Sequence, residues 1–384
     1  MFDLRSILGW PPPHDVPTSL SLCGELKHKT ECLGTYMLEP QRTAQGKPVW
    51  KHATEDRWIA FASDGKWMIQ EGAIVGDNNI TLLKLEDNNA SLPHQSTAVW
   101  EEFVGKDEGW VKAPSCKCFG DVPTSMSLCG ELEHKTACLG TYMLAPHRTA
   151  NGKPVWKHAS EDRWIACIST GIWKVQEGVA VGVNTLGFLK LEDTTASLPH
   201  QSTGVWEEYD GTAKQWLKAP SCKCFGDVPT SMSLCGELEH KTACLGTYML
   251  APHRTANGKP VWKHAMEDKW IAWASDGKWI VQIGANVGSN LSLMTLQDTT
   301  ASLPHQSTGV WEESDGKQLV KAPSCKCFGD VPTSLSLCGE LKHKTACLGT
   351  YMLAPKRTAN GKPVWKHATE DYWIAWSSTG KWSY

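Results

Sequence analysis

The chain has 384 residues, a formal net charge of −3 and 41% hydrophobic residues. This hydrophobic content is sufficient for buried cores, and no block of like charge gives a reason to expect nucleic acid or an anionic membrane as a partner. No run of about 18 apolar residues occurs, so we expect no membrane span. The chain is unusual in its 20 Trp and 15 Cys, against only 7 Phe and 7 Tyr.

The first residues, 1–14, read MFDLRSILGWPPPH. A secretory signal peptide needs a basic start, an apolar stretch of about 7–15 residues and a small-residue cleavage site. Only a few apolar residues around Ile7 precede Trp-Pro-Pro-Pro, so we predict no signal peptide and interpret 1–14 as a leader before the repeats.

A long internal repeat of about 105 residues follows the leader. Each unit opens with DVPTS(L/M)SLCGEL, and each full unit closes with KAPSCKCFG. A unit of this length is the size of an independent small domain and exceeds the usual solenoid or propeller repeat. The predicted domains are repeat 1 at 15–120, repeat 2 at 121–226, repeat 3 at 227–329, and a half unit, interpreted as truncated, at 330–384.

Extended segments alternate with turn signals along each unit. In repeat 2, an Asn-Gly pair that favours a tight hairpin separates two β-rich runs. Short strands at regular spacing, with turn residues between them and no helical period, predict an all-β fold of tandem antiparallel sheet or barrel-like modules. The predicted strands are Thr141–Ala145 and Pro154–Ala159 in repeat 2, and Trp58–Ala62, Lys66–Gln70, Thr81–Leu85, Val99–Phe103 and Trp110–Ala113 in repeat 1.

The period-two alternation of a strand assigns faces to the side chains. Trp67 and Ile69 share one face, which we predict to be core. The position of Phe61 becomes Cys167 in repeat 2 and Trp in repeats 3 and 4. A packed core does not accept such volume changes without a cost of about 1–3 kcal/mol or more, so this position is predicted at a rim or on the surface.

Each full unit holds four cysteines in a C-x8-C pair and a C-x-C pair, which is typical of a disulfide framework. The C-x-C thiols could pair within their own unit or with the C-x8-C of the next. A zinc site, although C-x2–4-C is its usual spacing, and buried reduced thiols are alternatives. Cys167 is left over as a free thiol. The disulfide candidates are Cys23, Cys32, Cys116, Cys118, Cys129, Cys138, Cys222, Cys224, Cys235, Cys244, Cys325, Cys327, Cys338 and Cys347.

Paired cysteines would place the protein outside the cell or in the secretory pathway, because disulfides persist in oxidising compartments. The missing signal peptide leaves the localisation open.

The segment W-K-H-A-x-E-D brings His52, Glu55 and Asp56 together in the sequence, and the pattern recurs in every unit. A histidine beside acids could serve as general acid and base. The sequence places no nucleophile beside them, and adjacent acids at a turn are usually solvated. We therefore predict no catalytic residue, no cofactor and no metal site, with a hydrolase-type enzyme as the third hypothesis.

The tryptophans give the best functional lead, because aromatic faces bind sugars, cations and protein surfaces. Trp67 and Trp100 are predicted inside the core. The ligand-stacking candidates are Trp58, Phe61, Trp164, Trp270, Trp273, Trp373 and Trp376.

The run T-Y-M-L-A-P-x-R-T-A-N-G-K-P-V-W-K-H, followed by W-I-A-x-x-S-x-G-K-W, resembles a module found in tandem in algae, dinoflagellates and other unicellular eukaryotes. The resemblance covers the first half of each unit, residues 36–70 in repeat 1. It implies tandem β-modules with a Tyr-led strand and an NGxPVY/W hairpin, and it implies no established activity. This chain has Trp where the family commonly has Tyr after Pro-Val.

Three hypotheses for function follow. The first is a non-enzymatic repeat protein for multivalent recognition, with carbohydrate or a protein surface as the partner, because tandem sites raise avidity. The second is a disulfide-stapled structural or matrix protein. The third is the enzyme described above.

Overall fold

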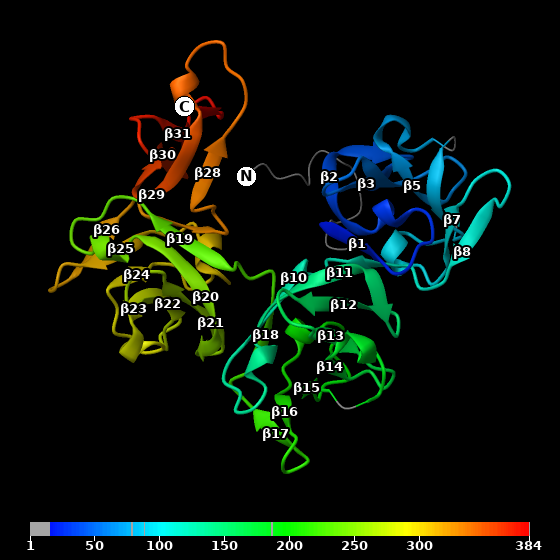
Figure 1. The fold of residues 1–384 in the computed structure, drawn as a ribbon, viewed down its shortest axis with the longest axis horizontal. Helices are drawn as coiled ribbons and strands as arrows, with labels where there is room; N and C mark the ends of the chain where they lie inside the picture. Colours follow the sequence, from blue (N-terminus) through cyan, green and yellow to red (C-terminus); the bar gives the residue numbers. More distant parts are fainter. Residues whose placement is uncertain (1–15, 78–79, 88, 186, 384) are drawn as a thin grey trace. The chain divides into compact units, whose positions relative to one another are not determined.

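The computed structural model describes residues 16–77, 80–87, 89–185 and 187–383. The fold is all-β, as predicted: three curled antiparallel sheets and a partial fourth follow one another along the chain (Figure 1). Helical segments in these ranges are 3-10 turns of three residues. None of them is long enough to cross a membrane. The leader predicted at 1–14 lies outside the described residues.

The chain divides into two compact units. The first comprises Met1–Met126 and Thr141–Lys218, and the second comprises Ser127–Gly140 and Ala219–Tyr384. Repeat 1 belongs to the first unit, repeats 3 and 4 belong to the second, and repeat 2 contributes to both.

Repeat 1 forms a nine-stranded sheet in the order β8-β7-β6-β5-β4-β3-β2-β1-β9. Neighbours in sequence are neighbours in the sheet, except that the last strand returns to pair with the first. The strands are β1 Ser19–Cys23, β2 Gly34–Ala44, β3 Lys47–His52, β4 Arg57–Phe61, β5 Trp67–Glu71, β6 Thr81–Leu85, β7 Trp100–Phe103, β8 Trp110–Ala113 and β9 Lys117–Gly120. The 3-10 turns are η3 Thr30–Cys32, η4 Gly72–Ile74 and η5 Pro93–Gln95.

Repeats 2 and 3 have the same strand order as repeat 1. Repeat 2 has strands β10 Ser125–Cys129, β11 Gly140–Ala150, β12 Lys153–His158, β13 Trp164–Cys167, β14 Trp173–Gln176, β15 Leu189–Leu191, β16 Trp206–Asp210, β17 Gln215–Ala219 and β18 Lys223–Gly226, with turns η6 Thr136–Cys138, η7 Gly178–Ala180 and η8 Pro199–Gln201. Repeat 3 has strands β19 Ser231–Cys235, β20 Gly246–Ala256, β21 Lys259–His264, β22 Lys269–Trp273, β23 Trp279–Ile283, β24 Met294–Leu296, β25 Trp311–Ser314, β26 Leu319–Ala322 and β27 Lys326–Gly329, with turns η9 Thr242–Cys244, η10 Gly284–Asn286 and η11 Pro304–Gln306.

The fourth repeat forms five strands in sequence order. They are β28 Ser334–Leu337, β29 Gly349–Ala359, β30 Lys362–His367, β31 Trp373–Trp376 and β32 Trp382–Ser383, with the turn η12 Thr345–Cys347.

In each of the three full repeats the last strand pairs with the first, and this closing pair is not among the strands predicted from the sequence. In repeat 1, β1 pairs with β9 in an antiparallel register that sets Leu22 opposite Cys118. Asp121, assigned by sequence to repeat 2, extends this closure: its carboxylate accepts hydrogen bonds from the Thr18 hydroxyl at 2.8 Å and from the Ser19 amide at 3.0 Å. The first residue of one sequence repeat therefore caps the sheet of the repeat before it.

The second strand is longer than predicted, because it continues through an irregularity. In repeat 2, β11 runs to Ala150, whereas the sequence interpretation ended the strand at Ala145. The register between β11 and β12 shifts between Leu144 and Thr149, where residues stay extended around Pro146 without a regular ladder. The shift is consistent with the proline, because proline has no amide to donate to a ladder. The Asn151-Gly152 hairpin follows as predicted, with both residues at positive φ.

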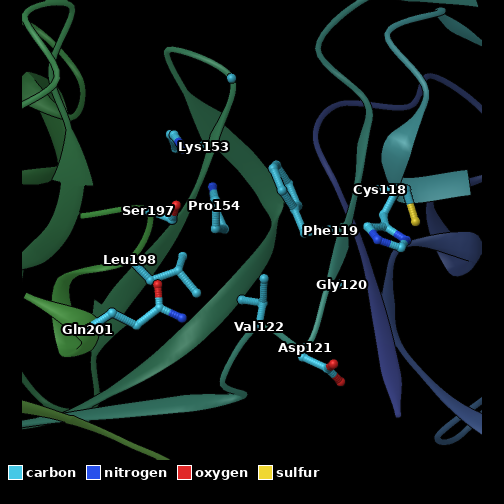
Figure 2. A pocket seen from close by; sticks show the side chains of 12 residues that line it. Cys118, Phe119, Gly120, Asp121, Val122, Lys153, Pro154, Ser197, Leu198 and Gln201 are labelled. Atoms are coloured by element: carbon cyan, nitrogen blue, oxygen red, sulfur yellow. The ribbon is translucent and has the colours of Figure 1, made fainter. Parts of the chain in front are cut away.

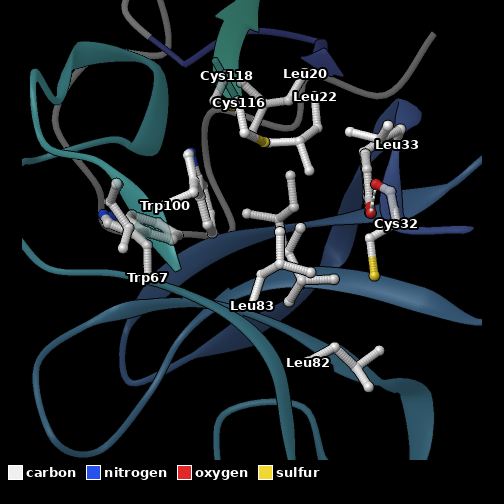
Figure 3. Packing of buried hydrophobic residues seen from close by; sticks show 14 of the residues in the cluster. Leu20, Leu22, Cys32, Leu33, Trp67, Leu82, Leu83, Trp100, Cys116 and Cys118 are labelled. Atoms are coloured by element: carbon white, nitrogen blue, oxygen red, sulfur yellow. Dashed lines mark hydrogen bonds between the residues drawn. The ribbon is translucent and has the colours of Figure 1, made fainter. Parts of the chain in front are cut away.

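One core runs through the whole of repeat 1 (Figure 3), and an equivalent core runs through repeat 3. In repeat 1, Leu20 and Trp50 from the first half share a buried cluster with Trp100 and Cys116 from the second half. Trp67 and Trp100 are fully buried, as predicted. Burial of indole rings makes these positions expensive to truncate, at about 3–5 kcal/mol for Trp→Ala.

The opposite face of the sheet carries a second, smaller apolar cluster. In repeat 1 it consists of Ala44, Val49, Trp58 and Ala60, with Val75 packed against them. Repeats 2 and 3 have equivalent clusters around Val155 and Val261. We refer to this side of each sheet as the outer face, because the large core lies on the other side.

Successive repeats contact one another through the same backbone hydrogen bond. Within the first unit, the Gly24 amide donates to the Pro146 carbonyl at 2.8 Å. Within the second unit, Gly130 donates to Pro252 and Gly236 donates to Pro355, both at 2.8 Å. The irregular stretch of the second strand in one repeat is thus the acceptor for the repeat before it.

Candidate functional site

The outer face presents a row of three side chains on adjacent strands. In repeat 1, the register sets Met37 of β2 opposite Lys51 of β3, and Lys51 opposite Trp58 of β4. Cross-strand partners share a face, so all three lie on the outer side. Met37 is 49% exposed and Lys51 is exposed, whereas Trp58 is 7% exposed. The row is thus a surface of one thioether and one ammonium group beside a largely covered indole.

An arginine completes this surface from beyond the irregularity in β2. The guanidinium of Arg42 lies over the Trp58 ring, 4.4 Å from its centre, and the Lys51 ammonium lies 5.4 Å from the same centre. One Arg42 amino group donates to the Gly72 carbonyl at 3.1 Å. Cations stacked on indole gain about 0.5–1 kcal/mol at exposed sites. Both cations are therefore held in place by contacts on their own sheet.

An aspartate fixes the indole from its edge. The Trp58 indole N–H donates to the Asp56 carboxylate at 3.0 Å. That hydrogen bond is the main reason why the pKa of Asp56 is lowered, so the group is ionised at neutral pH. Gly72 closes the arrangement because a Cβ there would come within 2.5 Å of the Asp56 carboxylate. We call Met37, Arg42, Lys51, Asp56, Trp58 and Gly72 the cation–tryptophan cluster.

The cluster recurs along the chain. The Arg-to-ring distance is 5.3 Å at Trp164, 5.3 Å at Trp270 and 5.0 Å at Trp373. The corresponding Lys-to-ring distances are 5.5, 5.6 and 5.4 Å. Equivalent members are Met143, Arg148, Lys157, Asp162, Trp164 and Gly178 in repeat 2; Met249, Arg254, Lys263, Asp268, Trp270 and Gly284 in repeat 3; and Met352, Arg357, Lys366, Asp371 and Trp373 in repeat 4.

The predicted stacking position at Trp58 thus has a different surface from the one expected. The sequence gives Trp58 as a surface candidate for ligand stacking, and in the structure cations of the same sheet lie over the ring. The equivalent rings of repeats 2 to 4 are half-buried. A ligand approaching this face therefore meets the Met, Lys and Arg side chains before the indole.

The predicted stacking position at Phe61 lies at the rim of the main core. Phe61 is half-buried and packs edge-on against Trp67, with ring centres 5.2 Å apart. Trp273 makes the same contact at 5.1 Å, and Trp376 makes it with Trp382 at 5.2 Å. In repeat 2 this position is Cys167, which is 4% exposed. A rim location accounts for the range of side-chain volumes at this position.

The His/Glu/Asp segment has its polar atoms engaged in local structure. The two ring nitrogens of His52 contact the main chain: Nε2 lies 3.2 Å from the Leu33 carbonyl, and Nδ1 accepts from the Glu55 amide at 3.0 Å. The ring is 8% exposed and packs edge-on against Tyr36. Through these contacts the imidazole holds the loop before β4. Asp56 belongs to the cation–tryptophan cluster.

The cysteines are thiols in this structure, and Cys338 is the exposed one among fifteen. Burial raises the pKa of Cys23 to about 12 and that of Cys32 to about 12. The pairing of β1 with β9 brings the C-x-C segment of repeat 1 beside Cys23 of the same repeat. Of the two pairings that the sequence left open, this neighbourhood favours pairing within a repeat. Among the described residues, no group of His, Cys, Asp or Glu is arranged to hold a metal ion.

A pocket of about 290 Å³ in the first unit is the second candidate site (Figure 2). It lies where the end of repeat 1 meets repeat 2. Phe119 and Val122 lie on one side and Leu198 and Gln201 on the other, with Pro154 between them. Its walls combine apolar side chains with polar and charged ones, among them His94, Asp121 and Lys153.

Comparison with known proteins gives no relative for this chain. No family model, no curated protein and no solved structure shows significant similarity to it. The structure supports tandem, Trp-rich antiparallel β half-barrel modules, without a family to which they belong.

The sequence interpretation missed the exposed half of the cluster. It selected Trp58 but not Met37, Arg42 or Lys51. Two features of the sequence indicate these residues. Lys51 follows Trp50 in the strand and therefore points to the other face of the sheet, and an R-T-A segment precedes each of these hairpins. The contact between Arg42 and Trp58 could not be predicted, because Arg42 follows the irregularity in β2 and the alternation of a regular strand does not give its position.

Proposed function

We propose that this chain is a tandem-repeat binding protein that recognises carbohydrate through the outer faces of its sheets, acting by binding rather than by catalysis. The observation that supports this proposal best is the cation–tryptophan cluster. It combines an exposed apolar side chain with fixed hydrogen-bond donors, which is the combination that a sugar ring with its C–H surface and hydroxyl groups requires.

Several copies of one site make weak contacts useful. A single shallow surface of this kind would bind a sugar weakly, because it buries little area. Clusters on one chain engage a polymer together and raise the overall affinity by about 10²–10⁴ when the geometry permits. The module therefore suits a ligand that is itself repetitive.

Intrinsic fluorescence tests this function, because a cluster tryptophan lies beneath the surface that the ligand would cover. We expect a saturable change in tryptophan emission on titration with at least one polysaccharide of a panel of neutral and charged glycans. No change with any glycan of the panel would contradict carbohydrate recognition and would favour a protein surface as the partner.

A structural or matrix role is the second candidate, and the repeated junction favours it. The Gly24–Pro146 hydrogen bond and its two equivalents join successive repeats in the same way. A structural or matrix protein would self-associate in the absence of any glycan. Sedimentation velocity at rising protein concentration tests this role: growth of large species supports it, and a constant sedimentation coefficient opposes it.

We also propose kinship with the tandem NGxPVY/W modules of unicellular eukaryotes, on the Tyr-led strand and the hairpin that both share. If the cysteines of a repeat are oxidised in the native protein, the same proposal places the protein in the secretory pathway or outside the cell.

A further inference from the structure

We propose that the ligand class is an anionic polysaccharide, whose sulfate or carboxylate groups are bound by the arginine and lysine of each cation–tryptophan cluster. This inference rests on the proposed function and narrows it to one chemistry. A neutral polysaccharide would instead be the expected ligand of an open tryptophan face.

The cations of the cluster in repeats 1 to 3 form no ion pair with any described residue, unlike two other cations close to them in the sheet. Among the described residues of repeats 1 to 3, no carboxylate lies within 4.0 Å of the cluster arginine or lysine. By contrast, Arg57 on the same strand as Trp58 contacts Glu71 at 3.5 Å, and Lys84 contacts Glu101 at 3.2 Å. The cluster cations are therefore available to a ligand, whereas these neighbouring cations are already neutralised.

The one acid of the cluster is committed elsewhere. Asp56 accepts the indole hydrogen bond, and its equivalents Asp162 and Asp268 also accept from the backbone amides of Gly178 and Gly284, at 3.3 and 3.2 Å. Two cations against one committed carboxylate leave a positive site. Such a site attracts anions and repels a cationic partner.

The placement of the arginine suits an anionic oxygen. The Arg42 guanidinium lies over the indole, and one of its amino groups donates to the Gly72 carbonyl, so its position is largely fixed before a ligand arrives. Planar guanidinium groups form strong, charge-assisted hydrogen bonds with carboxylate and similar oxyanions. Met37, half-exposed in the same row, offers an apolar contact for the sugar ring that carries the anion.

A neutral sugar would gain less from this surface. Stacking on Trp58 would require the Arg42 guanidinium to leave the ring, since the indole is only 7% exposed. An anionic sugar keeps that contact and adds a charge interaction above it. The covered ring thus favours charged over neutral polysaccharides.

The test compares two triple variants of the full chain that remove the same charge. The site variant is Lys51→Gln, Lys157→Gln and Lys263→Gln. The control variant is Lys112→Gln, Lys218→Gln and Lys321→Gln, which replaces exposed lysines near the other end of each sheet. The probes are dextran sulfate and unsulfated dextran of matched length, with poly-glutamate as an acidic polypeptide.

We expect the unmodified chain to bind dextran sulfate in a salt-dependent manner and unsulfated dextran at least about tenfold more weakly. The site variant should lose about tenfold or more in affinity for dextran sulfate, because each of the three clusters loses a charge-assisted hydrogen bond to the ligand. The control variant should lose less than about twofold, and both variants should keep the far-UV circular dichroism spectrum of the folded, unmodified chain.

Three results would overturn the assignment of an anionic polysaccharide, and a fourth would reject the proposed function itself. Equal losses in the site and control variants would show attraction by overall charge alone. Poly-glutamate bound as tightly as dextran sulfate, with the same loss in the site variant, would identify an acidic polypeptide as the ligand class. Equal binding of the two dextrans would reject the anionic chemistry while leaving carbohydrate recognition intact, whereas failure of both dextrans and of a neutral glycan panel would reject the proposed function itself.

Discussion

At the scale of single residues, Gly34 shows how closely the start of β2 is packed. Its φ is +141°, and a Cβ there would come within 2.4 Å of Nε2 of His52. That ring holds the backbone at Leu33 and Glu55. The glycine is required both by its backbone conformation and by the ring that lies against it.

Replacement of Gly34 by alanine should therefore destabilise repeat 1. We expect a loss of about 2–4 kcal/mol in the free energy of unfolding, from backbone strain and displacement of the His52 ring. Urea denaturation of the full chain measures it. Gly211→Ala is the control, because a Cβ there meets nothing within 4 Å, and it should change stability by about 0.5 kcal/mol or less. Equal stability of the two variants would contradict the packing described.

The reactivity of the thiols is a second prediction at this scale. Only the thiolate reacts with alkylating agents, and burial raises the pKa of Cys23 to about 12, while Cys338 is exposed. Iodoacetamide at pH 8 should label Cys338 first and Cys167 slowly, since Cys167 is buried and its pKa is also raised by burial. Mass spectrometry of peptides, before and after reduction, separates protected thiols from disulfides. Rapid labelling of Cys23 in the native chain would oppose this account.

At the scale of elements, the turn η5 Pro93–Gln95 carries a titratable group in a partly buried position. Nδ1 of His94 is buried without a hydrogen-bond partner among the described residues. The imidazole packs against Gly120 on β9, where an added Cβ would lie 3.1 Å from the ring. Burial lowers the pKa of His94 below its ordinary 6.5, with partial compensation by Asp121. Burial also lowers the pKa of His305 in repeat 3.

The lowered pKa of His94 predicts that the free energy of unfolding decreases in mild acid. Because the folded-state pKa of His94 lies below 6.5, the unfolded chain binds a proton more readily, and stability is complete above pH 6.5 and falls as pH is lowered below it. Calorimetric unfolding temperatures between pH 8 and pH 5 measure the effect. A variant with His94→Gln and His305→Gln should show a smaller decrease over that range, and an unchanged decrease would refute the assignment.

The shared core predicts that the two halves of a repeat unfold together. Trp100 from the second half and Leu20 from the first lie in one buried cluster. Trp100→Ala should cost about 3–5 kcal/mol. Hydrogen exchange should then show loss of protection in β1 to β3 together with β7 to β9. Loss confined to β7 and β8 would indicate that the first half is an independent sheet.

The sequence was a good guide to hairpins and a poor guide to closure. Asn151-Gly152 and the alternation around Trp67 predicted strands and faces correctly, because local backbone preference and burial act within a few residues. The β1–β9 pair joins residues about a hundred positions apart, and nothing local in S-L-S-L-C or K-C-F-G identifies its partner. For the same reason the sequence indicated Trp58 but not the cations above it, since Arg42 reaches the ring only through an irregular strand.

At the scale of the whole molecule, the proposed binding surface is present in several copies. Clusters in repeats 1 to 3 have both cations free of carboxylates, whereas in repeat 4 Lys366 contacts Asp371 at 3.7 Å. A ligand that spans a single cluster should therefore bind the first three alike and the fourth more weakly. Multivalent binding of a long polymer would follow from these separate sites.

The stoichiometry with a short sulfated oligosaccharide tests this claim most directly. Isothermal titration calorimetry of the full chain should give three to four molecules bound per chain, with the Lys51, Lys157 and Lys263 triple variant reduced to one or none. A single site per chain, or a stoichiometry that the triple variant leaves unchanged, would contradict the assignment of binding to the cation–tryptophan clusters.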